Sequence, residues 1–220
     1  MELLWKLPLI AAAGYLLGNI QTGVIVSKTM GKFDVRRRGS QSAGTTNVLR
    51  TMGWLPSMIT LVGDVLKSVA AALIGLYLGG PWGSWGARLG GLCAVLGHNW
   101  PVLFGFKGGK GIAASLGLIL VIDPPWVGAA LVACQAIVLA ITRTMSVASL
   151  ASASVYAVLS LIVHWGRWPE AGYGLLVAAL AFFSHRSNIE RISEKRENKL
   201  DFKEISDISK KFYEGKGKDK

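Results

Sequence analysis

Apolar segments separated by short polar loops are the feature that most constrains what this chain can fold into. We place them at residues 7–27, 57–78, 87–104, 112–122, 125–141, 146–164 and 170–184. A helix needs about 20 residues to cross the hydrocarbon core of a bilayer, and several segments are shorter. If the fourth and seventh are half-embedded, the number of full crossings falls by two. The pattern predicts an all-α polytopic membrane protein with about seven transmembrane helices, some of them short.

The composition agrees with a membrane protein. Apolar residues make up 51% of the chain, mean hydropathy is +0.42, and 17% of residues are charged. Soluble domains are about a quarter charged. The turn Asp123-Pro124-Pro125 separates the fourth segment from the fifth, because proline cannot continue a helix. We interpret the first segment as an uncleaved span, since Ala11-Ala12-Ala13 follows Lys6 too closely for a signal peptide.

The positive charges sort onto one face of this predicted topology. Seven crossings place four loops on that face, and these loops hold 20 of the 24 Lys and Arg residues. They are residues 28–50, 105–111, 142–145 and 185–220. Basic loops stay on the cytoplasmic side of a cell membrane, so we expect an outside N-terminus and a cytoplasmic C-terminus. The sorting explains the net charge of +11 without a nucleic-acid partner.

Three loops on the basic face are rich in groups that bind phosphate. The first, residues 36–50, reads RRRGSQSAGTTNVLR. Hydroxyl and amide side chains donate to phosphate oxygens, and Arg50 can grip two of them at once. Its candidate residues are Gly39, Ser40, Gly44, Thr46, Asn47 and Arg50. A flexible loop with a Ser/Thr helix cap and lipid-facing arginines is the open alternative.

The second loop, residues 97–111, reads GHNWPVLFGFKGGKG and leads into the apolar run that starts at Ile112. Glycines let several N–H groups approach one ligand, and a helix N-terminus adds partial positive charge. The candidates here are Lys107, Gly108, Gly109 and Lys110. The loop is not an ATP-binding P-loop, which needs a glycine where Phe104 stands and a hydroxyl where Gly111 stands. A tight turn with surface lysines is the alternative.

The third loop, residues 183–191, reads FSHRSNIER and supplies His185 and Asn188. His185 and Glu190 nearly match the H-x-x-x-x-D dyad of acyl-CoA-type acyltransferases, but the acid differs. A helix C-terminus with favourable cations is the alternative. Ser146, after the basic turn at 142–145, is a further candidate, whereas we assign Ser149 to helix–helix packing.

Ionisable groups inside the apolar segments are costly, so they line a site or pair with each other. Asp64 and Lys67 lie three residues apart on one helical face, which leaves both readings open. His98 lies within a segment, where a structural hydrogen bond competes with a role in the site. Cys93 and Cys134 are interpreted as apolar thiols. The sequence has no Ser/His/Asp triad and no metal-ligand cluster, so we expect neither a metal nor a cofactor.

These motifs resemble one family, the bacterial integral-membrane glycerol-3-phosphate acyltransferases that use acyl phosphate. GSQSAGTTNVLR is similar to the family's G-S-x-N-x-G-A-T-N-x-x-R, and SHRSNIER to its R-H-R-x-N-I-x-R. The second loop matches every fixed position of G-x-x-H-x-x-P-x-x-x-x-x-K-G-G-K-G. The resemblance covers residues 10–192. Ser42, Thr45 and Ser184 depart from it, standing where the family has Asn, Ala and Arg.

The resemblance implies acyl transfer from acyl phosphate to the 1-hydroxyl of glycerol 3-phosphate, the first step of phospholipid synthesis. It implies catalytic roles for Ser40, Lys110, His185 and Asn188. The implied substrate-binding residues are Gly39, Gly44, Thr46, Asn47, Arg50, His98, Lys107, Gly108, Gly109 and Ser146. An enzyme that forms acyl phosphate is an implied upstream partner, and the acyl chain would lie among membrane lipids.

Residues 1–192 would then form the membrane acyltransferase domain and 193–220 a charged cytoplasmic tail. In the tail, Leu200, Ile205, Ile208 and Phe212 predict one stripe of a surface-lying helix, with disorder as the alternative. Two other functions are weighed: a transporter of anionic phosphorylated metabolites, and an acyltransferase using acyl-CoA or acyl carrier protein. A transporter would show repeated halves with broken helices, and no such repeat is visible.

Overall fold

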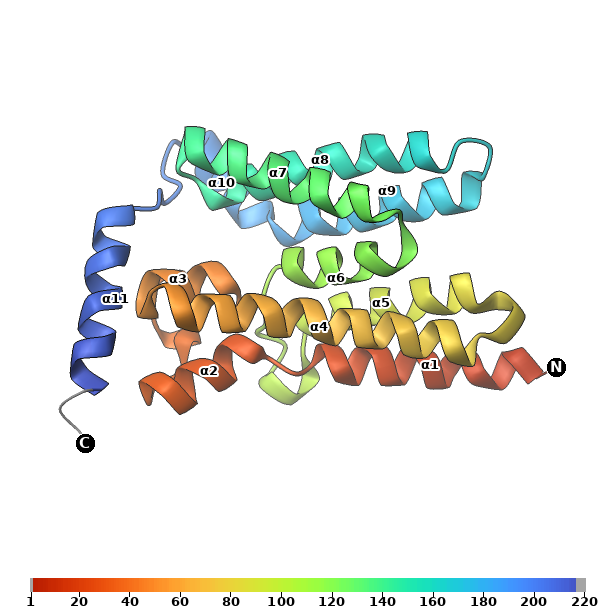
Figure 1. The fold of residues 1–220 in the computed structure, drawn as a ribbon, viewed down its shortest axis with the longest axis horizontal. Helices are drawn as coiled ribbons and strands as arrows, with labels where there is room; N and C mark the ends of the chain where they lie inside the picture. The colour runs from red at the N-terminus through yellow and green to blue at the C-terminus, as the bar shows by residue number, and fades with distance from the viewer. Residues whose placement is uncertain (1, 217–220) are drawn as a thin grey trace.

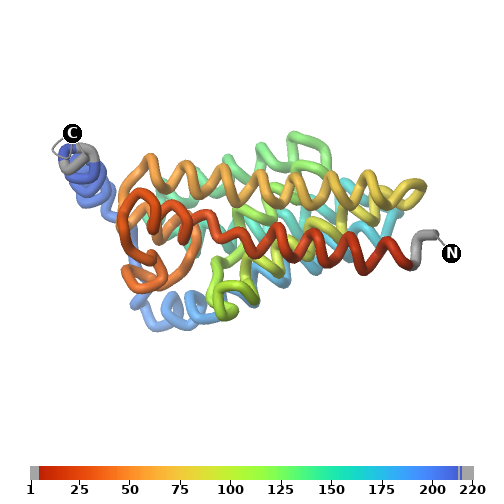
Figure 2. Tube along the Cα trace, turned by 90° about the horizontal axis from the view of Figure 1, so that it is seen from below, coloured from red at the N-terminus to blue at the C-terminus, as the bar shows by residue number. Residues whose placement is uncertain are grey.

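Helices running back and forth along one axis build the computed structural model, which describes residues 2–216 (Figures 1 and 2). The described residues contain helices and turns but no strand. The helices that fall in the predicted apolar segments are α1 (Glu2–Gly18), α2 (Thr22–Gly31), α4 (Trp54–Leu78), α5 (Gly83–Asn99), α6 (Ile112–Ile122), α7 (Pro125–Thr142), α8 (Met145–Val163) and α9 (Trp168–Ser184). The others are α3 (Thr45–Met52), α10 (Arg186–Ser193) and α11 (Phe202–Lys216). The all-α fold class is confirmed.

The number of long apolar helices is smaller than the seven segments predicted. Among the described residues, four stretches are long and apolar enough to cross a membrane: Trp5–Gly31, Trp54–Leu78, Pro125–Thr142 and Met145–Val163. The helix at Ile112–Ile122 has 11 residues and therefore spans about 16 Å, roughly half the hydrocarbon core. This agrees with the expectation that the fourth segment is half-embedded.

The span predicted at residues 7–27 corresponds to the apolar stretch Trp5–Gly31, but the helix within it is interrupted at Asn19-Ile20-Gln21. Two long-range hydrogen bonds satisfy polar groups at this break. The carbonyl of Ile20 accepts from Nζ of Lys67 at 2.6 Å, and Gln21 Nε2 donates to the carbonyl of His98 at 3.2 Å. Broken helices are tolerated inside a bundle where neighbours satisfy the backbone in this way.

The segment at 87–104 also ends earlier than predicted. Helix α5 stops at Asn99, and Trp100 has φ −128° and ψ 68°, outside the helical region. Proline at 101 is the physical reason, because its ring excludes the helical conformation of the preceding residue. Residues 100–111 therefore form a loop that folds back under the end of α5. The remaining predicted segments agree with the structure to within a few residues.

The helices pack as two groups with α6 between them. One group contains α1, α4 and α5, and the other α7, α8 and α9 (Figure 1). Buried side chains from both groups join in one apolar cluster around Leu118 of α6, including Val95, Val127, Tyr156 and Val177. The short helix thus fills the space between two larger layers. Its start faces the predicted motif loops.

The predicted motif loops gather in the half of the bundle that holds α3 and α10 in Figure 1, and hydrogen bonds from Ala43 and Arg36 join the second loop to the first. The turns at 79–82, 123–124 and 164–167 lie at the other end. The helix directions therefore bring together loops that are up to 150 residues apart in the sequence. This gathering is what the topology contributes to the site.

The segment after α10 folds back onto the bundle rather than leaving it. Leu200 and Ile205 are buried beside Leu49, and the ring of Phe202 stacks on Trp54 with centroids 6.4 Å apart. Helix α11 lies across α3 and the start of α4. A helix in this tail is confirmed from Phe202 to Lys216, although Leu200 of the predicted stripe lies before it, and residues 217–220 fall outside the described part of the chain.

Candidate active site

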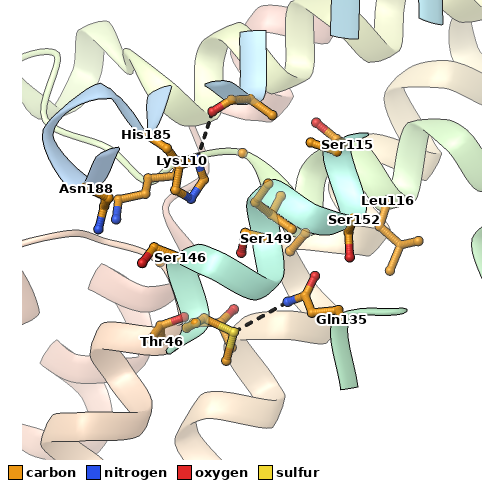
Figure 3. A pocket seen from close by; sticks show the side chains of 18 of the residues that line it. Thr46, Lys110, Ser115, Leu116, Gln135, Ser146, Ser149, Ser152, His185 and Asn188 are labelled. Carbon is orange, nitrogen blue, oxygen red and sulfur yellow. Dashed lines mark hydrogen bonds between the residues drawn. The ribbon is translucent and has the colours of Figure 1, made fainter. Parts of the chain in front are cut away.

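A cavity of about 370 Å³ opens between the motif loops and helices α6 to α9. Its polar end is lined by Ser40, Thr46, Arg50, Lys110, Ser146, His185 and Asn188. Its other end is lined mainly by apolar side chains, among them Leu116, Ile119, Leu131, Val132, Ala153 and Val177. In Figure 3, Lys110, His185, Asn188 and Ser146 lie toward one side of the cavity, and Ser115, Leu116 and Ser152 toward the other. One continuous space therefore offers binding to an anion and to a hydrocarbon.

The first motif loop is shaped by the side chain of Asn47. Its Oδ1 accepts from the backbone N–H of Ser40 at 2.9 Å, and its Nδ2 lies within hydrogen-bond distance of the carbonyls of Val35, Arg38 and Ser42. Gly39 has φ +56°, and a Cβ atom there would clash with Asn47 Oδ1. Only glycine fits such a position without strain. Asn47 thus fixes the loop that presents Ser40.

The second motif loop lies against the end of α5. The N–H of Gly109 donates to the carbonyl of His98 at 3.0 Å, and a Cβ atom on Gly108 or Gly109 would clash with His98. The carbonyl of Gly108 also accepts from the N–H of Ala43 at 3.2 Å, so the first and second loops are directly joined. This close packing is the physical reason for two successive glycines.

Lys110 is the cation that the second loop carries into the cavity. Burial lowers the pKa of its ammonium group, Arg191 and Arg50 add to this effect and the Glu197 carboxylate opposes it, so the pKa is about 8. Burial likewise lowers the pKa of Arg50. Lys110 is therefore charged at neutral pH and loses its proton in the mildly alkaline range. Lys107, by contrast, is exposed and does not line the cavity.

His185 lies at the end of α9 with its side chain buried. Its Nδ1 is 2.8 Å from the carbonyl of Ala181, which accepts only, so Nδ1 carries the proton and Nε2 is left as an acceptor. Burial, and secondarily the charge of Lys110, lowers the pKa of His185 to about 4. At neutral pH the ring is uncharged and offers one acceptor to the cavity.

A carboxylate that sequence reasoning missed occupies the polar end. Glu197 accepts hydrogen bonds from Asn188 Nδ2 at 2.7 Å, Ser146 Oγ at 2.9 Å and Arg191 Nε at 2.8 Å. Burial opposes its ionisation, but these hydrogen bonds hold the pKa of Glu197 below its usual value. Asn198 follows, and its carbonyl accepts from Arg50 at 3.0 Å. Asn188 and Ser146, which were predicted to bind or act on a substrate, thus donate here to the carboxylate of Glu197.

Ten of the fourteen predicted site residues line the cavity, and Gly39, Lys107, Gly108 and Gly109 do not. Ser42 and Thr45, which depart from the family pattern, line it as well, whereas Ser184 accepts a hydrogen bond from Asn99 Nδ2 at 2.8 Å. Their roles toward a substrate stay predictions.

Ser149 was assigned to packing, but it lines the cavity together with Ser152. The spacing of Ser146, Ser149 and Ser152 places one hydroxyl on each turn of the same face of α8, which is the signal that could have identified them. Ser152 Oγ also donates to the carbonyl of Leu131 at 3.1 Å, which ties α8 to α7.

The fold and the cavity define the class: an integral membrane protein whose cationic site opens into an apolar groove. The family model described as Glycerol-3-phosphate acyltransferase matches residues 8–195. A glycerol-3-phosphate acyltransferase from Thermoanaerobacter pseudethanolicus is 40% identical over 87% of this chain and 94% of its own length. One from Halalkalibacterium halodurans is 38% identical over 91% of this chain and 97% of its own length.

Among solved structures, the chain is similar to PlsY (YgiH), an integral membrane glycerol 3-phosphate acyltransferase crystallised in its glycerol 3-phosphate form. The TM-score is 0.81 and the identity 31%, covering 91% of this chain and 98% of that one. The chain belongs to the glycerol-3-phosphate acyltransferase family. It is therefore an acyltransferase of phospholipid synthesis, and the transporter alternative is set aside.

Proposed function

We propose that this enzyme takes its acyl group from acyl phosphate and transfers it to the 1-hydroxyl of glycerol 3-phosphate. The products are 1-acyl-glycerol 3-phosphate and inorganic phosphate. The observation that carries the proposal is the cavity itself, where half-buried cations and neutral donors meet an apolar groove between α6 and α9. Two phosphate groups must meet in one place in this reaction, and Arg50 and Lys110 offset their repulsion.

We assign the glycerol 3-phosphate to Arg50 and Lys110, with Ser146 and His185 beside them. The acyl-phosphate head is assigned to the loop from Gly39 to Asn47 together with Asn188. Its acyl chain then follows the apolar lining along Leu116, Ile119 and Leu131. Exposed Lys107 stays outside the cavity and attracts anionic substrates from a distance. Glu197 gives up its hydrogen bonds to Asn188 and Ser146 when a phosphate takes them.

The acceptor hydroxyl oxygen attacks the carbonyl carbon of the acyl phosphate, and the bond from that carbon to the phosphate oxygen breaks. The hydroxyl proton needs an acceptor. A phosphate monoester has its second pKa near about 6, whereas the pKa of His185 is lowered to about 4. The substrate phosphate is thus the stronger base. It takes the proton of the attacking 1-hydroxyl, and His185 Nε2 orients the acceptor by accepting a hydrogen bond from its 2-hydroxyl.

Acyl phosphate is an activated mixed anhydride, so positioning and charge stabilisation account for most of the catalysis. Lys110 steadies the negative charge that builds on the departing phosphate. Ser40 and Asn188 donate toward the carbonyl oxygen as it becomes negative. The protein needs no nucleophile of its own for this single displacement.

The geometry around Glu190 argues against acyl-CoA as the donor. In an acyl-CoA-type dyad, the acid would orient the histidine. Here Glu190 is exposed and absent from the cavity lining, and Nδ1 of His185 bonds to the carbonyl of Ala181 instead. The near match in sequence does not assemble into a dyad.

We also propose a cell-membrane location with the motif end of the bundle in the cytoplasm and the N-terminus outside. The support is the charge on that end, since the loops gathered there carry most of the chain's Lys and Arg residues. Both substrates are charged and water-soluble at their phosphate ends, so they reach this end without crossing the bilayer.

The test of the donor uses purified protein, glycerol 3-phosphate and one donor at a time: acyl phosphate, acyl-CoA or acyl carrier protein thioester. We expect lysophosphatidic acid from acyl phosphate and only background from the thioesters. Glu190→Ala should keep wild-type rates with acyl phosphate. Efficient transfer from a thioester, with acyl phosphate inert, would refute the proposed donor.

A further inference from the structure

Three ionisable side chains form a buried cluster directly beneath the second motif loop. Nζ of Lys67 lies 2.9 Å from Oδ1 of Asp64, 2.8 Å from Nδ1 of His98 and 2.6 Å from the carbonyl oxygen of Ile20. The side chains of Asp64 and Lys67 are 1% and 3% exposed. The cluster ties the break in the first span to the middle of α4 and the end of α5.

The contacts of Lys67 determine which nitrogen of His98 carries the proton. An ammonium group has three N–H donors and no acceptor. Its three neighbours are two oxygens and Nδ1 of His98. Nδ1 lies 2.8 Å from the ammonium group but 3.5 Å from Oδ1 of Asp64, so the shorter contact decides and Nδ1 accepts. His98 is therefore the neutral tautomer with its proton on Nε2. Lys67, itself held by the Asp64 carboxylate, selects this tautomer.

The protonated nitrogen of His98 faces the glycine turn. A Cβ atom on Gly109 would clash with Nε2, so this N–H lies against the Gly109 backbone. The carbonyl of His98 also accepts from the N–H of Gly109 at 3.0 Å. His98 and Asp64 both line the cavity. The cluster thus holds the turn that carries Lys110 and presents an N–H donor beside it.

We infer that Asp64 and Lys67 are positioning residues for the phosphate site, acting through His98. They fix the His98 tautomer and ring, and His98 in turn fixes the Gly108-Gly109 turn and points its Nε2–H toward substrate oxygens. The inference deepens the proposed function by adding these two residues to the glycerol 3-phosphate site. If this buried ion pair served stability alone, replacing both of its members by neutral side chains would leave the binding of glycerol 3-phosphate unchanged.

The kinetic test compares Asp64→Asn and Lys67→Met with the double variant that carries both changes. Each single change leaves one buried charge without its partner, so both should lower the melting temperature in detergent. The double variant removes both charges and should recover most of the melting temperature. Its KM for glycerol 3-phosphate should stay about 10- to 100-fold above wild type, because His98 has lost its partner. Recovery of KM together with melting temperature would overturn the inference.

Asp123→Asn is the matched control. Asp123 is also a buried carboxylate paired with a histidine, His164, at 2.7 Å, but it lies at the opposite end of the bundle. The Asp123→Asn variant should have a lower melting temperature, like Asp64→Asn, and an unchanged KM for glycerol 3-phosphate. An equal rise in KM would mean that KM reports general destabilisation, and the inference would fail.

The second readout does not depend on activity. Protein labelled with ¹⁵N-histidine contains three histidines, His98, His164 and His185, and single His→Gln variants assign their signals. We expect His98 to show a protonated Nε2 and an unprotonated Nδ1 in the wild type, and a mixture of tautomers in Lys67→Met. A protonated Nδ1 in the wild type would contradict the inference. If this signature is present and acyl phosphate gives no product, the proposed donor fails and the assignment of His98 stands.

Discussion

Nδ2 of Asn188 donates to Oε1 of Glu197 at 2.7 Å, so a carboxylate from the segment after α10 lies where the motif residues converge. Ser146 donates to the same oxygen, and Arg191 binds the other. Glu197 therefore keeps these three donors oriented. It also adds a negative charge near Lys110 and Arg50, and this charge raises the pKa of both side chains.

Replacing Glu197 by glutamine should shift the pH dependence of the enzyme. Glu197 opposes the fall in the pKa of Lys110, so removing its charge lowers that pKa further. The alkaline limb of kcat/KM for glycerol 3-phosphate should therefore move to lower pH. Glu194→Gln is the matched control, because Glu194 pairs with Arg196 at the surface. An unchanged alkaline limb in Glu197→Gln would contradict the electrostatic coupling.

The wild-type enzyme should lose activity as pH rises through about 8. The reason is that the folded-state pKa of Lys110 is lowered to about 8, so its charge is complete below that pH and lost above it. The measurement is kcat/KM for glycerol 3-phosphate between pH 6 and pH 10. Lys110→Met should nearly abolish turnover, and Lys107→Met, with its exposed side chain, should reduce it far less. A flat profile to pH 10 would rule out Lys110 as the titrating group.

Arg50→Lys should raise the KM for glycerol 3-phosphate. Arginine offers a planar fork of donors, and lysine a compact point charge that cannot reproduce it. Losing one charge-assisted hydrogen bond costs about 1.5–3 kcal/mol, or roughly 10- to 100-fold in kcat/KM. Arg186→Lys is the control, because Arg186 is exposed and does not line the cavity. Wild-type kinetics in folded Arg50→Lys would place the phosphate elsewhere.

Much of the helical layout was predictable because apolar length and proline positions act locally. The limits of α6 and α7 follow from the break at Asp123-Pro124-Pro125, which acts within the chain itself. The interruption at Ile20 was not predictable from local pattern, since it depends on Lys67 capping a carbonyl 47 positions away. The helix propensity of the local sequence carries no information about a contact with so distant a residue.

The site was predictable to the extent that its chemistry lies in compact motifs. Arg50, Lys110 and Asn188 come from three loops with phosphate-binding character, and all of them reach the cavity. Glu197 was missed because it follows the last motif, in a charged segment interpreted as a tail. Its role depends on the fold-back at Leu200, whose N–H donates to the carbonyl of Arg143 at 2.7 Å.

The orientation in the membrane is tested by single cysteines at Ser84 and Ser187, both exposed, in a protein lacking Cys93 and Cys134. Ser84 lies at the far end of the bundle and Ser187 at the motif end. An impermeant thiol reagent added to intact cells should label the Ser84 position only. Labelling at the Ser187 position from outside would reverse the proposed topology.

The most direct test of the central claim is the stoichiometry of a reaction with purified protein, acyl phosphate and glycerol 3-phosphate. We predict one inorganic phosphate released for each 1-acyl-glycerol 3-phosphate formed, and no release above the spontaneous rate without glycerol 3-phosphate. Lys110→Met, shown to be folded, should release phosphate at that spontaneous rate. Phosphate release that continues at the wild-type rate without an acceptor, or lysophosphatidic acid formed without matching phosphate, would contradict a direct acyl transfer from acyl phosphate.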